Sequence, residues 1–467
     1  MRAASATKER TVPRQEVGRK QTKADRKKMG KLAREKCPIE SHSAINIPTR
    51  GRDVIEIVEK SNDGRIKELV PIRYARMLQS PFTFFRGSAA LMAADLAQTP
   101  SMGQFVQACG DCHLQNFGAF ATPERNIVVD INDFDETLPA PWEWDVKRLA
   151  TSYVLAAIDN KYDMDFGQEA AFIMAQSYRE YMSELSKMSV MEVWYSHIHQ
   201  DDLVDQVSPD TAKRALKIRE DAVRKSSPEL LMEKFTTSSD GSLRFKEMPP
   251  LLCHMEGVSA GLAEKEAFTE YLNTLSDDRR FLLEKFEVVD IARKVVGIGS
   301  VGTLCGVILL VSSEDDVLVL QIKEARKSVL EPFAGASRYT HHGQRIVQGQ
   351  RLMQAASDIF LGWVTGIRKP FRHFFIRQLR DVKISANSAL WSKRDFKVMA
   401  KAMGQILARA HARSGYPAVL NGYLGKSDEF ETAIAAYALE YATQTSRDHM
   451  VFQKACKSGR LPVQDLG

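Results

Sequence analysis

ACGDCHLQNFGAFATPERNIVVDINDFDETLPAPWEWDVKRLA, residues 108–150, is the stretch around which the rest of the sequence is organised. A polar turn at 122–126 separates two apolar runs, which predicts a β-hairpin with arms at 116–121 and 127–131. Polar and acidic residues surround one Phe directly after the second arm, at 132–136. The mouth of the hairpin therefore gathers several oxygen-bearing side chains.

Carboxylates crowded at one place repel each other, and a cation between them relieves that repulsion. Asn116, Asp133 and Asp135 offer only oxygen ligands, which suit a hard ion such as Mg²⁺ that commonly also holds a phosphate. Asp111 is close in sequence and is not needed as a ligand, so it could accept a proton from a hydroxyl. One base and two metal ligands are what phosphoryl transfer requires.

Three motifs carry a resemblance: Gly-Asp-x-His-x-x-Asn at 110–116, Asn-Asp-Phe-Asp-Glu at 132–136 and Trp-Asp-x-x-Arg at 144–148. Together they resemble the catalytic segment of aminoglycoside and choline kinase-like phosphotransferases. The resemblance implies that Asp111, Asn116 and Asp133 are catalytic, with Asn116 and Asp133 holding the metal. ATP and Mg²⁺ are the implied cofactors.

The same resemblance assigns supporting roles. It implies that Asp145 holds the catalytic loop by its backbone amides and that His113 gives structural support. Cys109 departs from the pattern, because the phosphotransferases usually have His at that place. From about Tyr74 to the end, the chain also resembles a bacterial family known only as domain of unknown function 2252, which implies no substrate.

A rival interpretation uses the same residues. Cys109-Gly-Asp-Cys112-His113 matches C-x-x-C-H, the attachment motif of c-type haem, and the cysteine pair could also be structural or bind zinc. Haem attachment requires export, and we find no signal peptide in the sequence.

Composition is that of a globular protein: 44% of the 467 residues are apolar and 27% are charged. Six scattered cysteines favour the cytoplasm. The net charge of +6 belongs to the first 36 residues, which hold 13 Lys and Arg against four acidic residues. We expect residues 1–37 to be a disordered basic tail; weak binding to nucleic acid or to an anionic surface is the alternative.

A helical segment is expected at 38–100, interrupted by an aromatic turn at Pro81–Gly87. Arg86 in that turn could bind phosphate or carboxylate, although packing at a helix end is the more common role. Residues 150–285 indicate further helices without strand signals. His197 and His199 could form a metal pair, but nearby residues add no further ligand.

The sequence changes character near residue 288 and becomes apolar and rich in glycine. A membrane helix at 295–313 and a dinucleotide loop are two interpretations, but no second span exists and no helix follows Gly302. The favoured interpretation is a kinase-type glycine loop, in which Gly297, Gly299, Ser300 and Gly302 bind the nucleotide.

Such a loop predicts a lysine on the next strand, and Lys323 lies there in Leu-Gln-Ile-Lys-Glu. The glutamate that normally pairs with it is missing from the helix expected at 343–362, and Glu331 lies earlier. Arg345 and Arg351 on that helix could face phosphate, although solvated charges are more common. The strand at 371–379 then leads to a hinge, and the helix at 392–412 resembles the one that precedes a catalytic loop.

The order of these elements differs from that of a kinase, because the catalytic loop precedes the glycine loop. We therefore expect an α+β, bilobal protein kinase-like fold that is circularly permuted, with a largely helical large lobe and a small antiparallel-sheet lobe. The expected divisions are 1–37, 38–100, 101–287 for the catalytic-loop half, 288–385 for the glycine-loop lobe, and 386–467.

The expected activity is ATP- and Mg²⁺-dependent transfer of phosphate to a hydroxyl of a small-molecule acceptor. A nucleotide-binding regulator without catalysis and a nucleotidyl transferase are the alternatives. We expect a cytoplasmic protein without a membrane span.

Overall fold

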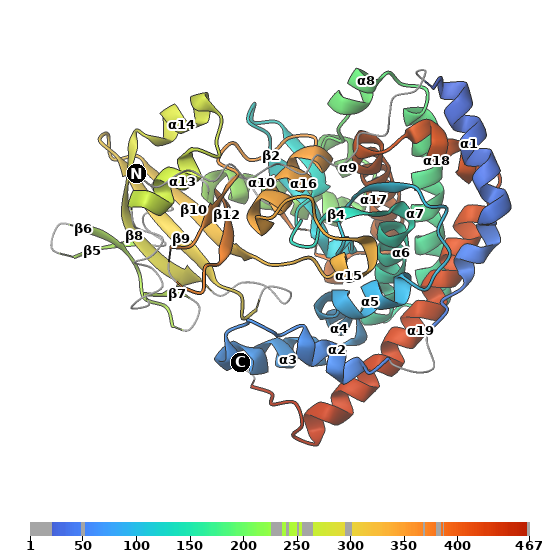
Figure 1. Cartoon of the computed structure of the whole chain (residues 1–467), viewed down its shortest axis with the longest axis horizontal. Coiled ribbons are helices and arrows are strands. Elements are labelled where there is room, and N and C mark those ends of the chain that lie inside the picture. Colours follow the sequence, from blue (N-terminus) through green and yellow to red (C-terminus); the bar gives the residue numbers. More distant parts are fainter. Residues whose placement is uncertain are drawn as a thin grey trace, which may run out of the picture.

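The chain forms two lobes, one built around an antiparallel sheet and one mainly of helices, in a computed structural model (Figure 1). The structure describes residues 21–47, 52–225, 236–239, 242–249, 252–254, 265–294, 301–367, 369–379, 384–385 and 387–464. The coarse expectation of a mixed α+β protein with small antiparallel sheets is confirmed. Among the described residues no helix is both long and apolar enough to cross a membrane.

The sheet lobe contains six strands in the order β11-β12-β10-β9-β8-β7, and all neighbours are antiparallel. Its strands and helices are β5 (Thr236–Ser239), β6 (Ser242–Phe245), β7 (Leu252–Cys253), α13 (Lys265–Leu272), α14 (Asp277–Leu283), β8 (Phe286–Lys294), β9 (Cys305–Ser312), β10 (Val317–Ala325), α15 (Glu331–Ala334), α16 (His342–Met353), β11 (Gly362–Thr365) and β12 (His373–Gln378).

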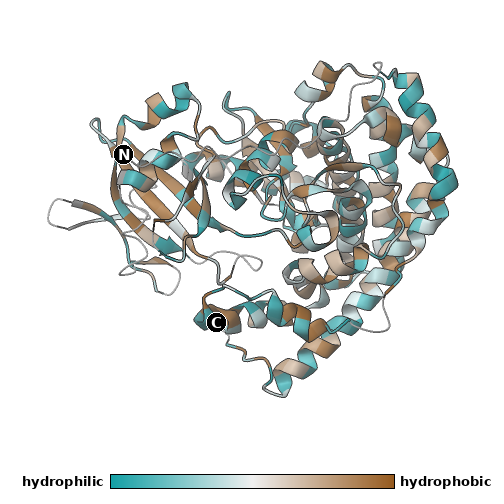
Figure 2. Cartoon of the chain, viewed as in Figure 1, coloured by the Kyte–Doolittle hydropathy of each residue, from teal (hydrophilic) through white to brown (hydrophobic). Residues whose placement is uncertain are grey.

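Both faces of the sheet are covered, which explains why β9 reads as a continuous apolar run. Ile308 and Leu310 pack with residues of α13 and α14 on one face, whereas Val307 and Leu309 pack with Phe245 of β6 on the other. The inner strands are accordingly coloured as hydrophobic (Figure 2). One alternative for the apolar run at 295–313 was a membrane helix. From residue 305 onward this run is instead strand β9.

The helical lobe holds the hairpin and most of the helices. Its elements are α1 (Lys23–Lys36), α2 (Val54–Lys60), α3 (Val70–Leu78), α4 (Pro81–Gly87), α5 (Ala89–Leu96), β1 (Phe105–Ala108), β2 (Phe117–Ala121), β3 (Ile127–Ile131), β4 (Leu138–Pro141), α6 (Trp142–Asp159), α7 (Met164–Leu185), α8 (Val190–Tyr195), α9 (Asp201–Val204), α10 (Pro209–Lys225), β13 (Ile384–Ser385), α17 (Lys393–Ser414), α18 (Pro417–Leu424) and α19 (Glu429–Lys457).

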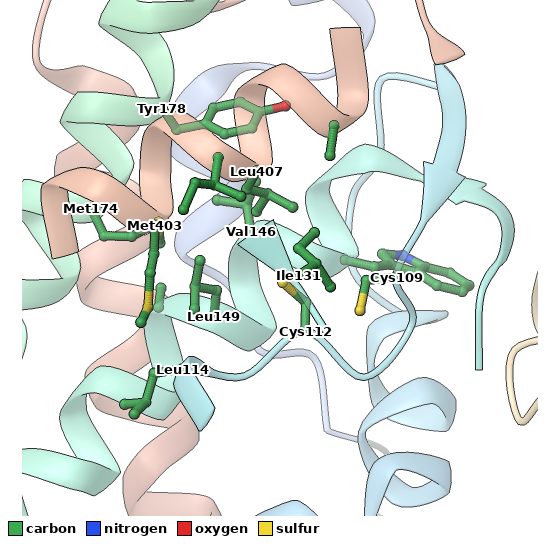
Figure 3. Packing of buried hydrophobic residues seen from close by; sticks show 14 of the residues in the cluster. Cys109, Cys112, Leu114, Ile131, Val146, Leu149, Met174, Tyr178, Met403 and Leu407 are labelled. Atoms are coloured by element: carbon green, nitrogen blue, oxygen red, sulfur yellow. The ribbon is translucent and has the colours of Figure 1, made fainter. Parts of the chain in front are cut away.

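The core of this lobe lies where α6, α7, α17 and α19 meet. Trp142 at the start of α6 stacks on Tyr178 of α7 with ring centroids 5.6 Å apart. Leu407 and Met403 of α17 pack against Val146 and other α6 residues (Figure 3). The loop that precedes the hairpin thus rests on a rigid, apolar base.

The hairpin forms as predicted, with β2 antiparallel to β3. Phe117 pairs with Ile131, so the two arms end together at the mouth. After β12 the chain returns to the helical lobe, where Ile384 of β13 pairs with Ala119 of β2.

The part of the basic N-terminal segment that the structure describes differs from the disordered arm that we expected at 1–37, and residues 1–20 of that prediction lie outside the described residues. Residues 23–36 form α1, which begins with a capping box between Thr22 and Asp25. The helix packs on α18 at two glycines: a Cβ at Gly30 would lie 2.0 Å from the Val419 carbonyl oxygen, and one at Gly422 would lie 2.1 Å from that of Lys27. This close packing orders α1, which the charge pattern of the sequence did not predict.

Three further expectations are wrong in detail. Pro81–Gly87 is helix α4 rather than a turn, because Ser80 caps it and Pro81 occupies its first turn. The region 150–285 contains β5, β6 and β7, whose runs are too short for periodicity to detect. The helix expected at 343–362 ends at Met353, and Gly362 already belongs to β11.

Candidate functional site

Asp145 fixes the loop that leads into the hairpin. Its carboxylate accepts hydrogen bonds from the backbone amides of Cys109 at 2.6 Å and Gly110 at 2.9 Å, which is the contact expected of it. His411 of α17 approaches the same carboxylate at 3.2 Å and also contacts Tyr178. Support for the loop therefore comes from α6 and α17.

Gly110 lets the loop pass close to the 132–136 segment. Its φ is +84°, and a Cβ there would lie 2.5 Å from the carbonyl oxygen of Glu136. Cys109 adds a thiol hydrogen bond to the Asp133 carbonyl at 3.3 Å. The two segments of the site are therefore held against each other by backbone contacts.

Asp111 forms an ion pair with Arg148 of α6. The Arg148 Nε donates to Asp111 Oδ1 at 2.7 Å, and a terminal amino group lies 2.5 Å from the same oxygen. Burial raises the pKa of Asp111 although Arg148 lowers it. His113 is buried beside it, with Nε2 3.9 Å from Asp111 Oδ2. The sequence assigns Arg148 no role beyond its place in the Trp-Asp-x-x-Arg motif. Its position three residues after Asp145, on the same helix face, is the signal that could have indicated this contact.

Asn116 lies at the hairpin mouth opposite Asn132, the residue before Asp133. The Asn132 amide donates to the Asn116 carbonyl at 2.8 Å, which continues the β2–β3 register by one pair. The Asn116 side-chain amide donates to the Asp111 carbonyl at 2.7 Å. Since that amide nitrogen is used, the Asn116 side-chain oxygen is the atom left for a ligand.

Lys323 reaches this mouth from the sheet lobe. Its ammonium lies 2.8 Å from Asp135 Oδ2 and 3.8 Å from Asp133 Oδ1. It extends from β10, an interior strand in which every residue is buried. Burial alone would lower the pKa of Lys323, but Asp133 and Asp135 outweigh it and the net pKa is raised. Lys323 and Asp133 therefore lie at one site, and the partner of Lys323 is an aspartate rather than a glutamate of α16.

Arg345 of α16 ties the same loop to the sheet lobe. Its guanidinium is 1% exposed and donates to the backbone carbonyls of Thr137, Asp135 and Arg326. Ser328 and Val329 also bond Glu136, through its carbonyl and carboxylate respectively. The expectation that Arg345 is a solvated helix charge or a phosphate ligand is therefore wrong, because its two terminal amino groups donate to backbone carbonyls and its unpartnered Nε is buried. Arg351 donates to the Leu361 carbonyl at 2.6 Å.

The residues at the mouth fit a hard divalent cation. Oδ1 of Asp135 is buried without a hydrogen-bond partner, and burial together with the Asp133 charge raises the pKa of Asp135. Across the described ranges, no group of three or more His, Cys, Asp or Glu side chains is placed to hold a metal. A cation here would use Asp133, Asp135 and the Asn116 oxygen, and Mg²⁺ commonly takes few protein ligands and keeps several waters.

The cysteine pair lies in the apolar core. Cys109 and Cys112 are both 0% exposed and pack near Ile131, Val146 and Leu149 (Figure 3). Burial raises the pKa of the Cys112 thiol well above its ordinary value, which disfavours the thiolate that metal binding needs. Neither sulfur is placed to meet a haem vinyl group, so burial opposes the rival interpretation.

Part of the expected glycine loop lies outside the described residues, namely Gly297, Gly299 and Ser300. Gly302 is described, with φ +86°, and its carbonyl accepts from the Ile66 amide at 2.7 Å. Arg65 donates to the neighbouring Val301 carbonyl at 2.6 Å. The start of β9 is therefore held by the segment between α2 and α3, a contact that the sequence did not predict.

A small cavity of about 80 Å³, open to solvent, adjoins the mouth. It is bordered by Asn132 directly before Asp133, by Gln350 and Gln354 of α16, and by Arg377 of β12.

His197 and His199 contact each other, with their Nε2 atoms 2.8 Å apart, on the surface beyond α8. They lie outside the cluster around Asp133, and the described part of the chain supplies them with no third metal ligand.

The architecture and site define an α+β protein in which two lobes meet at a carboxylate-rich hairpin mouth. A family model described as an uncharacterized protein conserved in bacteria, DUF2252, matches residues 65–455, and the chain belongs to this family. Searches of curated proteins and of solved structures gave no significant match.

Proposed function

We propose that this protein is an ATP- and Mg²⁺-dependent phosphotransferase that acts on a hydroxyl of a small-molecule acceptor. One observation carries the proposal: Lys323, on an interior strand of one lobe, contacts Asp135 and Asp133 at the hairpin mouth of the other, although Lys323 and Asp135 are 188 residues apart in sequence. A lysine facing metal-type carboxylates across two lobes is the arrangement that positions a nucleotide triphosphate.

The proposed fold is a circularly permuted kinase-like fold. Its support is the position of α17, whose end lies beside the strand that leads into the catalytic loop. The Gln107 amide of β1 donates to Ser414 Oγ at 2.9 Å, and Gly415 lies against Val106. In space, α17 is followed by β1 and then by the catalytic loop, which is the order of long helix and catalytic loop in kinases. In the chain, residues 393–415 come almost 300 positions after that loop.

Each residue at the mouth then has a task. Lys323 binds the nucleotide phosphates, while Asn116, Asp133 and Asp135 hold Mg²⁺, which neutralises charge on the transferring group. Asp111 orients the acceptor hydroxyl and accepts its proton; its raised pKa makes it a better base than an ordinary carboxylate. Positioning and charge neutralisation supply the rate enhancement.

Incubation with labelled ATP and Mg²⁺, in the presence of candidate hydroxyl compounds, tests the proposal. The wild type should release ADP and transfer label to an acceptor. Asp133→Ala should lose metal-dependent binding, whereas Asp111→Ala should keep binding and lose transfer. Glu124→Ala, at an exposed hairpin turn, is the control. Equal turnover by the Asp111 and Glu124 variants would contradict the assigned base.

A second candidate is a nucleotide-binding regulator without catalysis. The ion pair between Asp111 and Arg148 favours it, because a base held this tightly by a cation is less available for proton transfer. The same labelled reactions distinguish the candidates: ADP indicates phosphoryl transfer, pyrophosphate indicates nucleotidyl transfer, and bound but unchanged ATP indicates a regulator.

A further inference from the structure

Arg86, near the end of α4, has no protein partner for its charge among the described residues. Its Nε is buried without a hydrogen bond, and neither terminal amino group has a hydrogen bond or an ion pair. The side chain is only partly exposed, with the Phe82 ring 6.0 Å from its guanidinium carbon. A largely covered cation without a partner is costly.

Buried arginines elsewhere in the described chain have partners for at least part of the guanidinium, although Arg73, Arg345 and Arg409 each keep one buried nitrogen without a hydrogen bond. Arg86 differs from them because none of its nitrogens has a partner among the described residues. Arg73 donates to Asn62 and to the Gly87 carbonyl, Arg409 pairs with Asp130, and Arg345 donates to three carbonyls. Arg148 holds Asp111 and the Phe85 carbonyl. The fold therefore supplies partners where an arginine serves the structure, and it supplies none for Arg86.

The position of Arg86 is on the acceptor side of the site. Arg148 donates to Asp111 and to the Phe85 carbonyl, so it joins the residue next to Arg86 to the proposed base. The carboxylates whose charge reaches Arg86 are Asp111 and the exposed Asp159. Those that reach Lys323 are Asp133 and Asp135.

The charge balance near Asp111 also favours an anion. Arg86 and Arg148 are positive, and Arg148 already neutralises Asp111 through its ion pair. Burial lowers the pKa of His113 well below its ordinary value, so its ring adds no charge, and its buried Nδ1 has no hydrogen-bond partner. The charges of Asp133 and Asp159 also act on this region, but neither carboxylate bonds Arg86. The Arg86 guanidinium and the unpaired His113 nitrogen therefore stay available beside the base, which suits a negatively charged group that carries further acceptor atoms.

We propose that the acceptor bears a carboxylate or a phosphate group and that Arg86 binds it while the acceptor hydroxyl faces Asp111. This inference rests on the proposed phosphotransferase function. It defines the substrate class as an anionic hydroxyl compound, and it makes Arg86 a residue that determines specificity.

Calorimetry with matched probes tests the inference on the full chain. The probes are sn-glycerol 3-phosphate, glycerate and glycerol, which share a backbone and differ in the anionic group. The wild type should bind one of the two anions at least about tenfold more tightly than glycerol, and the preferred anion tells phosphate from carboxylate. Arg86→Gln should lose the preference, and Arg86→Lys should keep part of it.

Controls separate this inference from a structural role and from the proposed function. Arg447→Gln, at an exposed position of α19, should bind the anions as the wild type does. Mg·ATP affinity should be unchanged in Arg86→Gln. The inference is overturned if the wild type shows no anion preference, if Arg86→Gln keeps it, or if Arg86→Gln weakens Mg·ATP instead. Absence of Mg·ATP binding by a wild type that still prefers anions would overturn only the phosphotransferase proposal.

Discussion

Two carboxylate–cation contacts meet at the site, and they are built differently. Asp111 and Arg148 both belong to the helical lobe, and their side chains are 22% and 2% exposed. Asp133 and Asp135 are 40% and 31% exposed, and their cation, Lys323, comes from the sheet lobe. The first contact is an internal part of one lobe, whereas the second joins two lobes at a more open place.

This difference separates framework from binding. An ion pair within one lobe is fixed when that lobe folds and cannot exchange partners without exposing a buried charge. A contact between lobes at half-open carboxylates can exchange with a ligand that carries both a cation and phosphates. We therefore expect substitutions at the first contact to affect stability more, and substitutions at the second to affect nucleotide binding more.

The largest effect is expected at the base of the framework. Asp145→Ala leaves the buried amides of Cys109 and Gly110 without an acceptor and removes the partner of His411. We expect a loss of about 4 kcal/mol in unfolding free energy, measured by urea denaturation. Glu440→Ala, at an exposed position of α19, should change stability by less than about 0.5 kcal/mol. Similar values for the two variants would show that the loop is not held by Asp145.

A pair of matched variants should show that the two contacts contribute differently to stability. Arg148→Met leaves Asp111 without its cation and should cost about 2–3 kcal/mol of stability, discounted for the partial exposure of Asp111. Lys323→Met should cost only about 1 kcal/mol because Asp133 and Asp135 are more exposed. Urea denaturation gives both values, and a larger loss for Lys323→Met would reverse the comparison.

The pH dependence of turnover sharpens the role of Asp111. As a base it acts in the carboxylate form, so turnover should rise with pH through its pKa and be lost as pH falls through it. Because burial raises that pKa, the acidic limb should lie above the ordinary value of 3.8. Arg148→Met removes a contact that lowers the pKa, so the limb should move to higher pH. A limb that stays in place would show that another group titrates.

Substitutions of the cysteines should affect stability less than those at Asp145 and Arg148. Cys109→Ala and Cys112→Ala remove small buried groups and should each cost about 1–2 kcal/mol of stability. Metal analysis and visible absorbance of the purified protein should reveal neither zinc nor haem. Loss of a bound metal or of a haem spectrum in these variants would restore the rival interpretation.

The sequence was most informative where the site is local. The hairpin arms, Asn116, Asp133 and Asp135 all lie within about 20 residues, and turn chemistry with period-two alternation predicts the hairpin that brings their segments together. Motif order together with the resemblance led us to expect Lys323 in one site with Asp133, as a ligand of nucleotide phosphates. Neither source specified Asp135 as its principal partner.

The remaining misses share a physical cause. The sequence pattern of its helix predicts an exposed Arg345, but tertiary contacts with the 135–137 backbone bury this side chain. Helix α1 reads as a charged arm, yet Gly30 and Gly422 let it pack against α18. Burial and partner identity depend on the far side of the chain, which local patterns do not contain.

Calorimetric titration of Mg·ATP into the wild type, Lys323→Met and Lys327→Met tests the central claim most directly. Lys327 lies four residues away with a 65% exposed side chain, so its variant removes the same charge from outside the site. The claim that both lobes form one nucleotide site predicts metal-dependent binding that Lys323→Met weakens at least about tenfold and Lys327→Met leaves unchanged. A folded wild type that does not bind Mg·ATP, or equal binding by all three proteins, would contradict it.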